Sequence, residues 1–152
     1  MEASVQKSGQ VVVVNGEEHI AGRLASLLAK KLLEGERVVV VNTEKILISG
    51  DIDSIRRELE AKLEITSLTN PKHTPMHHRT PDRIFTRIVR GMVPRRKAKG
   101  RFALKRLRTY IGVPEEYKQA EKAVFKEAMI TKPAAYYVNL GEVARLIGWR
   151  GE

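Results

Sequence analysis

The sequence predicts an α/β fold built on a parallel sheet, with helices on both faces of the sheet and a basic helix–loop–helix attached. Two runs, Val11 to Val14 and Val38 to Val41, consist entirely of β-branched residues. Such continuous apolar runs are typical of parallel strands that are buried on both faces. A helical pattern lies between them, and a strand–helix–strand unit with short connections makes a right-handed crossover.

The first helix is predicted from about Gly22 to Glu34, where apolar residues recur at helical spacing and Gly35 follows as the C-terminal cap. The same spacing places Lys30 and Lys31 away from the core. We attribute Gly22 to close packing at the helix start. The apolar residues that carry the pattern are Ile20, Leu24, Leu27, Leu28 and Leu32.

After the second strand, the short apolar run from Ile46 to Ile48 ends in Ser49-Gly50. Asp51 is then expected to cap a second helix, because a side-chain oxygen at this position accepts a backbone N–H of the first turn. Its apolar residues fall on one helix face, as in an amphipathic surface helix. These residues are Ile52, Ile55, Leu59 and Leu63.

The middle of the chain changes character, since residues 66–81 contain three prolines and three histidines and are predicted to form an extended loop. Thr80 and Pro81 then mark a helix start, with Asp82 facing the helix dipole. This helix should run to about Arg90 and end at Gly91. Ile84 and Ile88 should form its buried stripe, flanked by Phe85 and Val89.

A basic loop, residues 95–99, is expected next, followed by a second basic helix from Arg101 to Leu107 that is anchored by Leu104 and Leu107. The tail should end in a helix from about Gly141 to Ile147. Asn139 and Glu142 stand before it at the spacing of a capping box.

Net charge is concentrated in one segment. The chain has 28 Lys and Arg against 18 Asp and Glu, a net charge of +10. Residues 72–108 contain thirteen of the basic residues and one acid, Asp82, so this segment carries +12 and the other 115 residues carry −2. A local charge of this density indicates a polyanionic partner, either nucleic acid or an anionic membrane surface.

Arginines at spacings of four and three share one face of the helix that starts at Pro81. Like charges stacked in this way repel by a few tenths of a kcal/mol per pair, and the planar guanidinium suits phosphate. Phe85 and Phe102 are expected in the core, which argues for folded RNA and against a single-strand reader that stacks bases on aromatics. The candidate RNA-binding residues are Lys72, His77, His78, Arg79, Arg83, Arg87, Arg90, Arg95, Arg96, Lys97, Lys99, Arg101, Lys105, Arg106 and Arg108.

Other classes of function have weaker support. The chain has no cysteine, which excludes disulfides and thiol nucleophiles, and His73 and His77 lack the partners of a metal site. Gly16 and Gly22 do not match a dinucleotide fingerprint, and the second strand ends in Asn42 where an acid would be required. No signal peptide or membrane span is apparent. The alternatives left open are a nucleotide-dependent enzyme, an RNA chaperone or regulator, and a peripheral membrane protein.

Two segments resemble one known family, the universal large-subunit ribosomal protein thirteen. VNGEEHIAGRLASLLAKKLLEGERVVVVNTEKILISGD (residues 14–51) is similar to its N-terminal hallmark. HHRTPDRIFTRIVRGMVPRRKAKGRFALKRLRTYIGVP (residues 77–114) is similar to its basic signature, and the Arg90 to Pro94 pattern is especially distinctive. The histidine-rich start of the second segment resembles the archaeal and eukaryotic branch, and the short C-terminus favours an archaeal source. The sequence departs from many relatives at Thr86, where an aromatic is common.

The resemblance implies a three-layer α/β/α domain around a four-stranded, mainly parallel sheet. It also implies a structural constituent of the large ribosomal subunit, in the cytoplasm, with no enzymatic activity and no cofactor. Its partners would be large-subunit ribosomal RNA and neighbouring ribosomal proteins. The chain is expected to form one domain with an α/β core (10–66), a basic RNA-binding segment (67–108) and a tail that packs back on the core (109–152).

Overall fold

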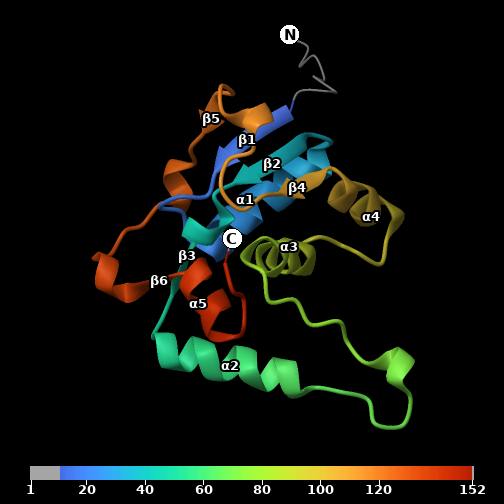
Figure 1. Cartoon of the computed structure of the whole chain (residues 1–152). Helices are drawn as coiled ribbons and strands as arrows, with labels where there is room; N and C mark the ends of the chain where they lie inside the picture. The colour runs from blue at the N-terminus through green and yellow to red at the C-terminus, as the bar shows by residue number, and fades with distance from the viewer. Residues whose placement is uncertain (1–10, 152) are drawn as a thin grey trace.

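The computed structural model describes residues 11–151, and its centre is a four-stranded sheet in which all pairings are parallel (Figure 1). The predicted α/β fold with a mainly parallel four-stranded sheet is therefore confirmed. The N-terminal residues in which we expected no signal peptide lie outside the described residues. In the order of the sheet, the strands are β4 (Leu107–Thr109), β2 (Arg37–Val41), β1 (Val11–Asn15) and β5 (Lys122–Ala123).

Both faces of the two central strands are covered, as the β-branched runs predict. Val14, Val38 and Val40 are buried against the helices on one face. On the other face, residues 110–120 cover a smaller cluster of Val13, Val39 and Val41. The helices on the first face are α1 (Ala21–Glu34), α3 (Pro81–Met92) and α4 (Ala98–Lys105).

The first helix has the predicted cap, but the role that we assigned to Gly22 is wrong. Gly35 has a φ of 104° and its N–H donates to carbonyls of the last turn of α1, as expected of a glycine cap. Gly22 is exposed and a Cβ there would meet nothing within 4 Å. The close approach lies at Gly16, where a Cβ would stand 2.7 Å from the Ile46 side chain and 2.8 Å from the Asn42 carbonyl oxygen.

The second helix, α2 (Ile52–Glu64), begins as predicted at Asp51, whose carboxylate accepts the Ser54 N–H over 3.3 Å. Its apolar stripe is only half-buried, because α2 packs on α5 (Leu140–Leu146) at one end and leaves an open cleft toward α3. Figure 1 shows α2 at the margin of the molecule.

The basic segment forms two helices whose bounds differ from the prediction. In α3, Phe85 and Val89 are fully buried and Ile88 is half-buried, so the stripe is rotated relative to our expectation. The following helix begins at Ala98 and ends at Lys105. Leu107, predicted as helical, starts β4 and pairs with Val38. The sheet edge therefore overrides the local helical pattern.

The tail returns to the core through backbone hydrogen bonds. The Ile20 N–H donates to Ala128 over 2.8 Å, and the Leu140 N–H donates to Ile46 over 2.8 Å. The expected capping box before α5 is not formed, since the Asn139 amide donates to the Glu142 carboxylate and neither side chain bonds the backbone. A small antiparallel sheet of β3 (Leu47–Ser49) and β6 (Tyr137–Asn139) completes this side.

Short 3₁₀ turns connect the other elements. The 3₁₀ turns are η1 (Thr43–Lys45), η2 (Pro71–His73), η3 (Glu115–Tyr117), η4 (Lys126–Ala128) and η5 (Ala134–Tyr136).

Across residues 11–151 none of the helices combines the length and apolarity that crossing a membrane requires.

Candidate nucleic-acid interface

The loop between α2 and α3 is held in place by hydrogen bonds at both ends. His77 Nε2 lies 2.9 Å from the Ile65 carbonyl oxygen, and the Arg87 guanidinium donates to the Met76 carbonyl over 2.6 Å. The exposed Lys72 projects from the 3₁₀ turn of this loop. Arg87 thus positions the loop on α3, and His77 links the end of the loop to the residue that follows α2. Lys72 is presented to solvent.

Helix α3 presents three arginines on the side opposite its buried face. Ile84, Phe85 and Val89 are buried, and α3 packs along α1. Arg83 and Arg87 are exposed and Arg90 is half-buried. The helix therefore presents a row of guanidiniums, as the spacing of four and three predicts.

His78 lies within the field of these arginines. Burial lowers its pKa, and the positive charges of Arg87, Arg83 and Arg90 lower it further, while Asp82 acts in the opposite direction. His78 is therefore held in the neutral form, which can accept or donate a hydrogen bond without adding to the local repulsion. Among residues 11–151, no three His, Asp or Glu side chains are grouped as a metal site would require.

The basic turn before α4 is held against that helix by a glycine. The Lys97 N–H donates to the Pro94 carbonyl over 3.0 Å. Gly100 is buried, and a Cβ there would overlap the Pro94 carbonyl group. This close approach needs a residue without a side chain. The turn therefore displays the exposed Arg95, Arg96 and Lys97 from a fixed position.

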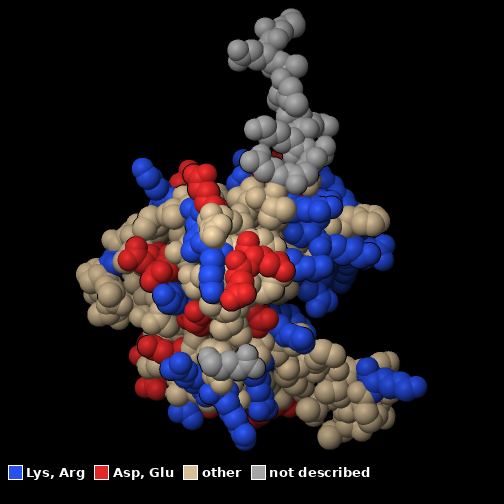
Figure 2. Space-filling model, turned by 45° about the horizontal axis from the view of Figure 1, so that its top comes forward, with Lys and Arg blue, Asp and Glu red and all other residues tan. Residues whose placement is uncertain are grey.

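The positive charges of the basic segment lack ion-pair partners within the described part of the chain. None of the ion pairs found among residues 11–151 includes a residue between 72 and 108. In α2, by contrast, Arg56 pairs with Glu60 at 2.7 Å, and this contact raises the arginine's pKa. Figure 2 shows the two patterns: blue groups gather on the right, whereas red and blue alternate elsewhere. Such a surface attracts a polyanion.

Most of the candidate residues are accessible to a partner. His77, His78 and Arg90 are half-buried at the edge of the surface. Eleven candidates are exposed: Lys72, Arg79, Arg83, Arg87, Arg95, Arg96, Lys97, Lys99, Arg101, Lys105 and Arg108.

Arg106 differs from the other candidates, because its side chain is half-buried and bonds within the protein. Its guanidinium turns inward and donates to the Leu32 carbonyl over 2.7 Å. Its Nε–H is buried and finds no partner among the described residues. Leu32 lies in the last turn of α1, where its carbonyl also accepts the Gly35 N–H and a cation is favourable. Arg106 is therefore a structural residue that joins β4 to the end of α1.

The prediction that Phe102 is a core residue is wrong. Its side chain is 59% exposed, with the Lys105 ammonium 5.6 Å from the ring centre. The buried side of α4 consists of Gly100 and Ala103, with Leu104 half-buried. A helical projection centred on Gly100 would have placed Phe102 on the other side. The basic surface therefore includes an accessible aromatic ring.

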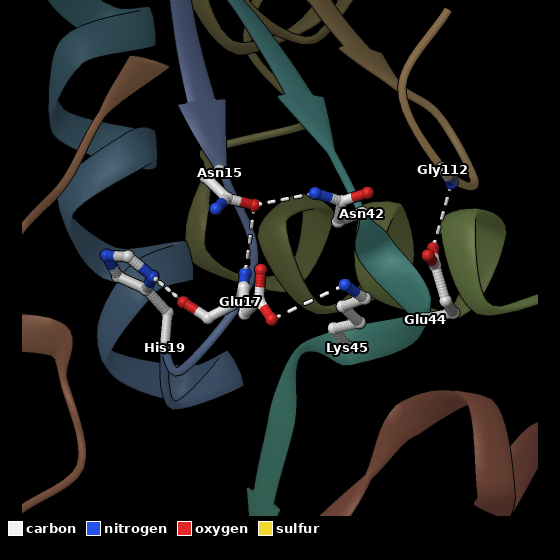
Figure 3. A network of polar contacts seen from close by, with 7 residues as sticks. All are labelled: Asn15, Glu17, His19, Asn42, Glu44, Lys45 and Gly112. Carbon is white, nitrogen blue, oxygen red and sulfur yellow. Dashed lines mark hydrogen bonds and ion pairs between the residues drawn. The ribbon is translucent and has the colours of Figure 1, made fainter.

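A polar network joins the carboxyl ends of β1 and β2 (Figure 3). The Asn15 side-chain oxygen accepts from the Asn42 amide at 2.9 Å, and Glu44 accepts the Gly112 N–H at 3.0 Å. Asn42 has a φ of 55°, a left-handed conformation that asparagine tolerates better than most residues. In open α/β sheets this edge is the usual ligand site. Here the side chains bond to each other and to the connection that follows β4.

His19, which no sequence pattern identified, is the buried centre of the contact with the tail. It is 1% exposed, and Nε2 accepts the Phe125 N–H over 3.0 Å. The proton must then lie on Nδ1, which donates to the Glu17 carbonyl over 2.7 Å (Figure 3). A lone histidine before a helix has no spacing that reveals this role. Its function is structural, because both ring nitrogens are satisfied by backbone groups.

Comparison with known proteins agrees with the motifs. The family model described as Ribosomal protein L13 matches residues 9–116. A protein of Aeropyrum pernix named large ribosomal subunit protein uL13 is 48% identical, with 92% of this chain and 91% of the relative covered. Proteins with the same name from Archaeoglobus fulgidus and Methanosphaera stadtmanae are 43% and 40% identical, with 91% of this chain covered in both alignments and 88% and 97% of the relatives. The chain belongs to the ribosomal protein L13 family.

Proposed function

We propose that this protein is a structural constituent of the large ribosomal subunit that binds folded ribosomal RNA and supports subunit assembly in the cytoplasm. The observation that carries the proposal is the basic surface of residues 72–108, whose charges have no acidic partners among residues 11–151. The relatives' shared name indicates the subunit. Neighbouring ribosomal proteins would complete the set of partners, and the role needs no enzymatic activity or cofactor.

The RNA contacts are proposed to come from the candidate residues other than Arg106. Guanidiniums and ammonium groups on α3, on the basic turn and on α4 would bind phosphates along a folded RNA, releasing counterions. Because the backbone at these positions belongs to packed helices and a glycine-supported turn, the points from which these side chains project are fixed before binding. A fixed array of charges selects RNA by shape. The half-buried His77 and His78 would lie at the edge of the RNA.

We also propose that the chain folds as a single domain, in which the tail folds together with the α/β core. Backbone bonds of residues 122–140 to β1, Ile20 and Ile46 support this. Removing the tail should expose the sheet edge at β1 and unfold the core. Residues 11–108 made alone should therefore lack a cooperative thermal transition.

Binding of the purified protein to archaeal large-subunit ribosomal RNA, compared with an unrelated folded RNA of equal length across a salt series, tests the function. The ribosomal RNA should be bound orders of magnitude more tightly at physiological salt. Both affinities should fall as salt rises, because phosphate neutralisation releases counterions. Equal binding of the two RNAs at every salt concentration would contradict the proposal and favour an RNA chaperone or regulator.

A matched pair of double variants links binding to the basic surface. Arg95→Ala with Lys97→Ala removes two exposed charges of that surface. Arg56→Ala with Lys62→Ala removes two charges from α2 that pair with Glu60 and Glu58. The first pair should lower the salt slope by roughly 0.9 for each phosphate that is no longer neutralised. The second should leave the slope unchanged, although both lower the net charge equally.

A further inference from the structure

A hollow of about 650 Å³ lies beside α4, on the face of the sheet opposite α1. Strand register explains which side chains meet there. Val11 pairs with Arg37, and Val39 pairs with Arg108. Paired residues, and residues two apart on a strand, point to the same face of a sheet. Arg37, Val39 and Arg108 therefore share one surface.

The hollow combines an apolar floor, an aromatic wall and a cationic rim. Val39 and the half-buried Tyr117 line the floor, and Phe102 of α4 forms the wall. Lys105 and Arg108 stand at the rim with Arg37. Arg106 also lines the hollow, with its guanidinium bonded to the Leu32 carbonyl. Within the described part of the chain, no carboxylate lines the hollow and none of these cations forms an ion pair.

We propose that this hollow holds a single nucleotide that ribosomal RNA extrudes from its helical stacks, with the base against Phe102 and the phosphate between Arg37 and Arg108. The inference rests on the proposed function and adds a specific contact to it. A phosphate alone would need the cations but not the aromatic wall or the apolar floor. An extruded nucleotide uses all three, since unstacked bases bind aromatic side chains and Arg planes. The volume falls within the roughly 300–1,000 Å³ typical of small-ligand sites.

The chain contains a matched control for this site. Tyr136 is also 59% exposed, and the Lys132 ammonium lies 5.7 Å from its ring centre. Phe102 and Lys105 make the same kind of pair at 5.6 Å. Only the Phe102 pair borders the hollow with its additional arginines. A difference between the two aromatic positions therefore reports the hollow and not general exposure of an aromatic ring.

The test measures the affinity of the full chain for archaeal large-subunit ribosomal RNA. Phe102→Ala should weaken binding roughly 5- to 100-fold, the decrease typical of removing a base-stacking aromatic. The slope of affinity against salt should stay unchanged, because every cation that neutralises a phosphate remains in place. Arg108→Ala should instead lower the slope by roughly 0.9. Tyr136→Ala should bind like the wild type.

A fluorescence experiment reports the stack directly and does not depend on affinity. In a Trp149→Phe background, Phe102→Trp should be quenched when ribosomal RNA binds, and Tyr136→Trp should keep its emission. Thermal unfolding of every variant verifies the fold. Wild-type affinity of Phe102→Ala together with unquenched Phe102→Trp would overturn the nucleotide site and leave ribosomal RNA binding intact. A wild type that does not prefer ribosomal RNA would overturn the proposed function itself.

Discussion

The Arg87 guanidinium donates a 2.6 Å hydrogen bond to the Met76 carbonyl, joining α3 to the loop between α2 and α3. One residue thus belongs to the arginine face and also positions the loop that carries Lys72. The exposed position of Arg87 on the arginine face predicts that a substitution there weakens RNA binding and leaves folding nearly intact. The hydrogen bond to Met76 adds a local structural effect to that expectation.

Arg83→Ala and Arg87→Ala separate the two roles. Both should reduce affinity for ribosomal RNA and lower its salt slope by roughly 0.9. Only Arg87→Ala should release the loop and accelerate tryptic cleavage after Lys72 and Arg79, because the Arg83 side chain makes no hydrogen bond within residues 11–151. Timed proteolysis with mass spectrometry measures the difference. Equal cleavage in the two variants would show that the hydrogen bond to Met76 does not hold the loop.

Gly100→Ala should displace the basic turn. The new Cβ would overlap the Pro94 carbonyl group, and overpacking of a filled site costs about 1–3 kcal/mol. A lower Tm and weaker RNA binding are expected together. Gly91→Ala is the control, since nothing lies within 4 Å of that position on α3. Alanine there should raise stability by up to about 1 kcal/mol, and the opposite ranking of the two Tm values would show that Gly100 does not support the turn.

His19→Leu should destabilise the packing of the tail on the core. The Phe125 N–H would have no acceptor, and an unsatisfied buried donor costs about 1–3 kcal/mol. Urea unfolding measures the decrease in stability, and faster amide hydrogen exchange at Phe125 locates it. His73→Leu, at an exposed histidine of the loop, should change stability by no more than about 0.5 kcal/mol.

His78 should titrate below the ordinary histidine pKa of roughly 6.5, because burial and the arginines of α3 disfavour its charged form. NMR titration of the imidazole protons measures this pKa directly. As pH falls, the unfolded chain takes up the proton before the folded one. The stabilising contribution of His78 is therefore complete above about pH 6.5 and declines below it.

His78→Asn removes that contribution. The decrease in Tm between pH 7.5 and pH 5.5 should be smaller in the variant than in the wild type. An equal decrease in both proteins, or a pKa above that of the unfolded chain, would show that burial and the arginines do not lower the pKa of this histidine.

Patterns in the sequence determined much of the fold. The valine runs predicted β1 and β2, the helical spacing with Gly35 predicted α1, and Asp51 was correctly identified as a cap. These predictions were correct because burial on both faces and local capping are encoded by residues close together in the chain. The spacing of the arginines in α3 likewise predicted that they share one face of the helix, because helical geometry alone determines which residues lie on the same face.

The tertiary structure decided what depends on partners distant in sequence. Leu107 joins the sheet because it pairs with Val38 at the edge of β2. Arg106 turns inward because its guanidinium donates to the Leu32 carbonyl in the last turn of α1. Phe102 stays outside because Gly100 is the residue of α4 that meets Pro94. His19 is buried because a backbone N–H more than a hundred residues away donates to it. The chain determined which residues are basic, apolar or helical, and long-range packing determined which of them are exposed on the basic surface, because a neighbour's position is not encoded in local periodicity.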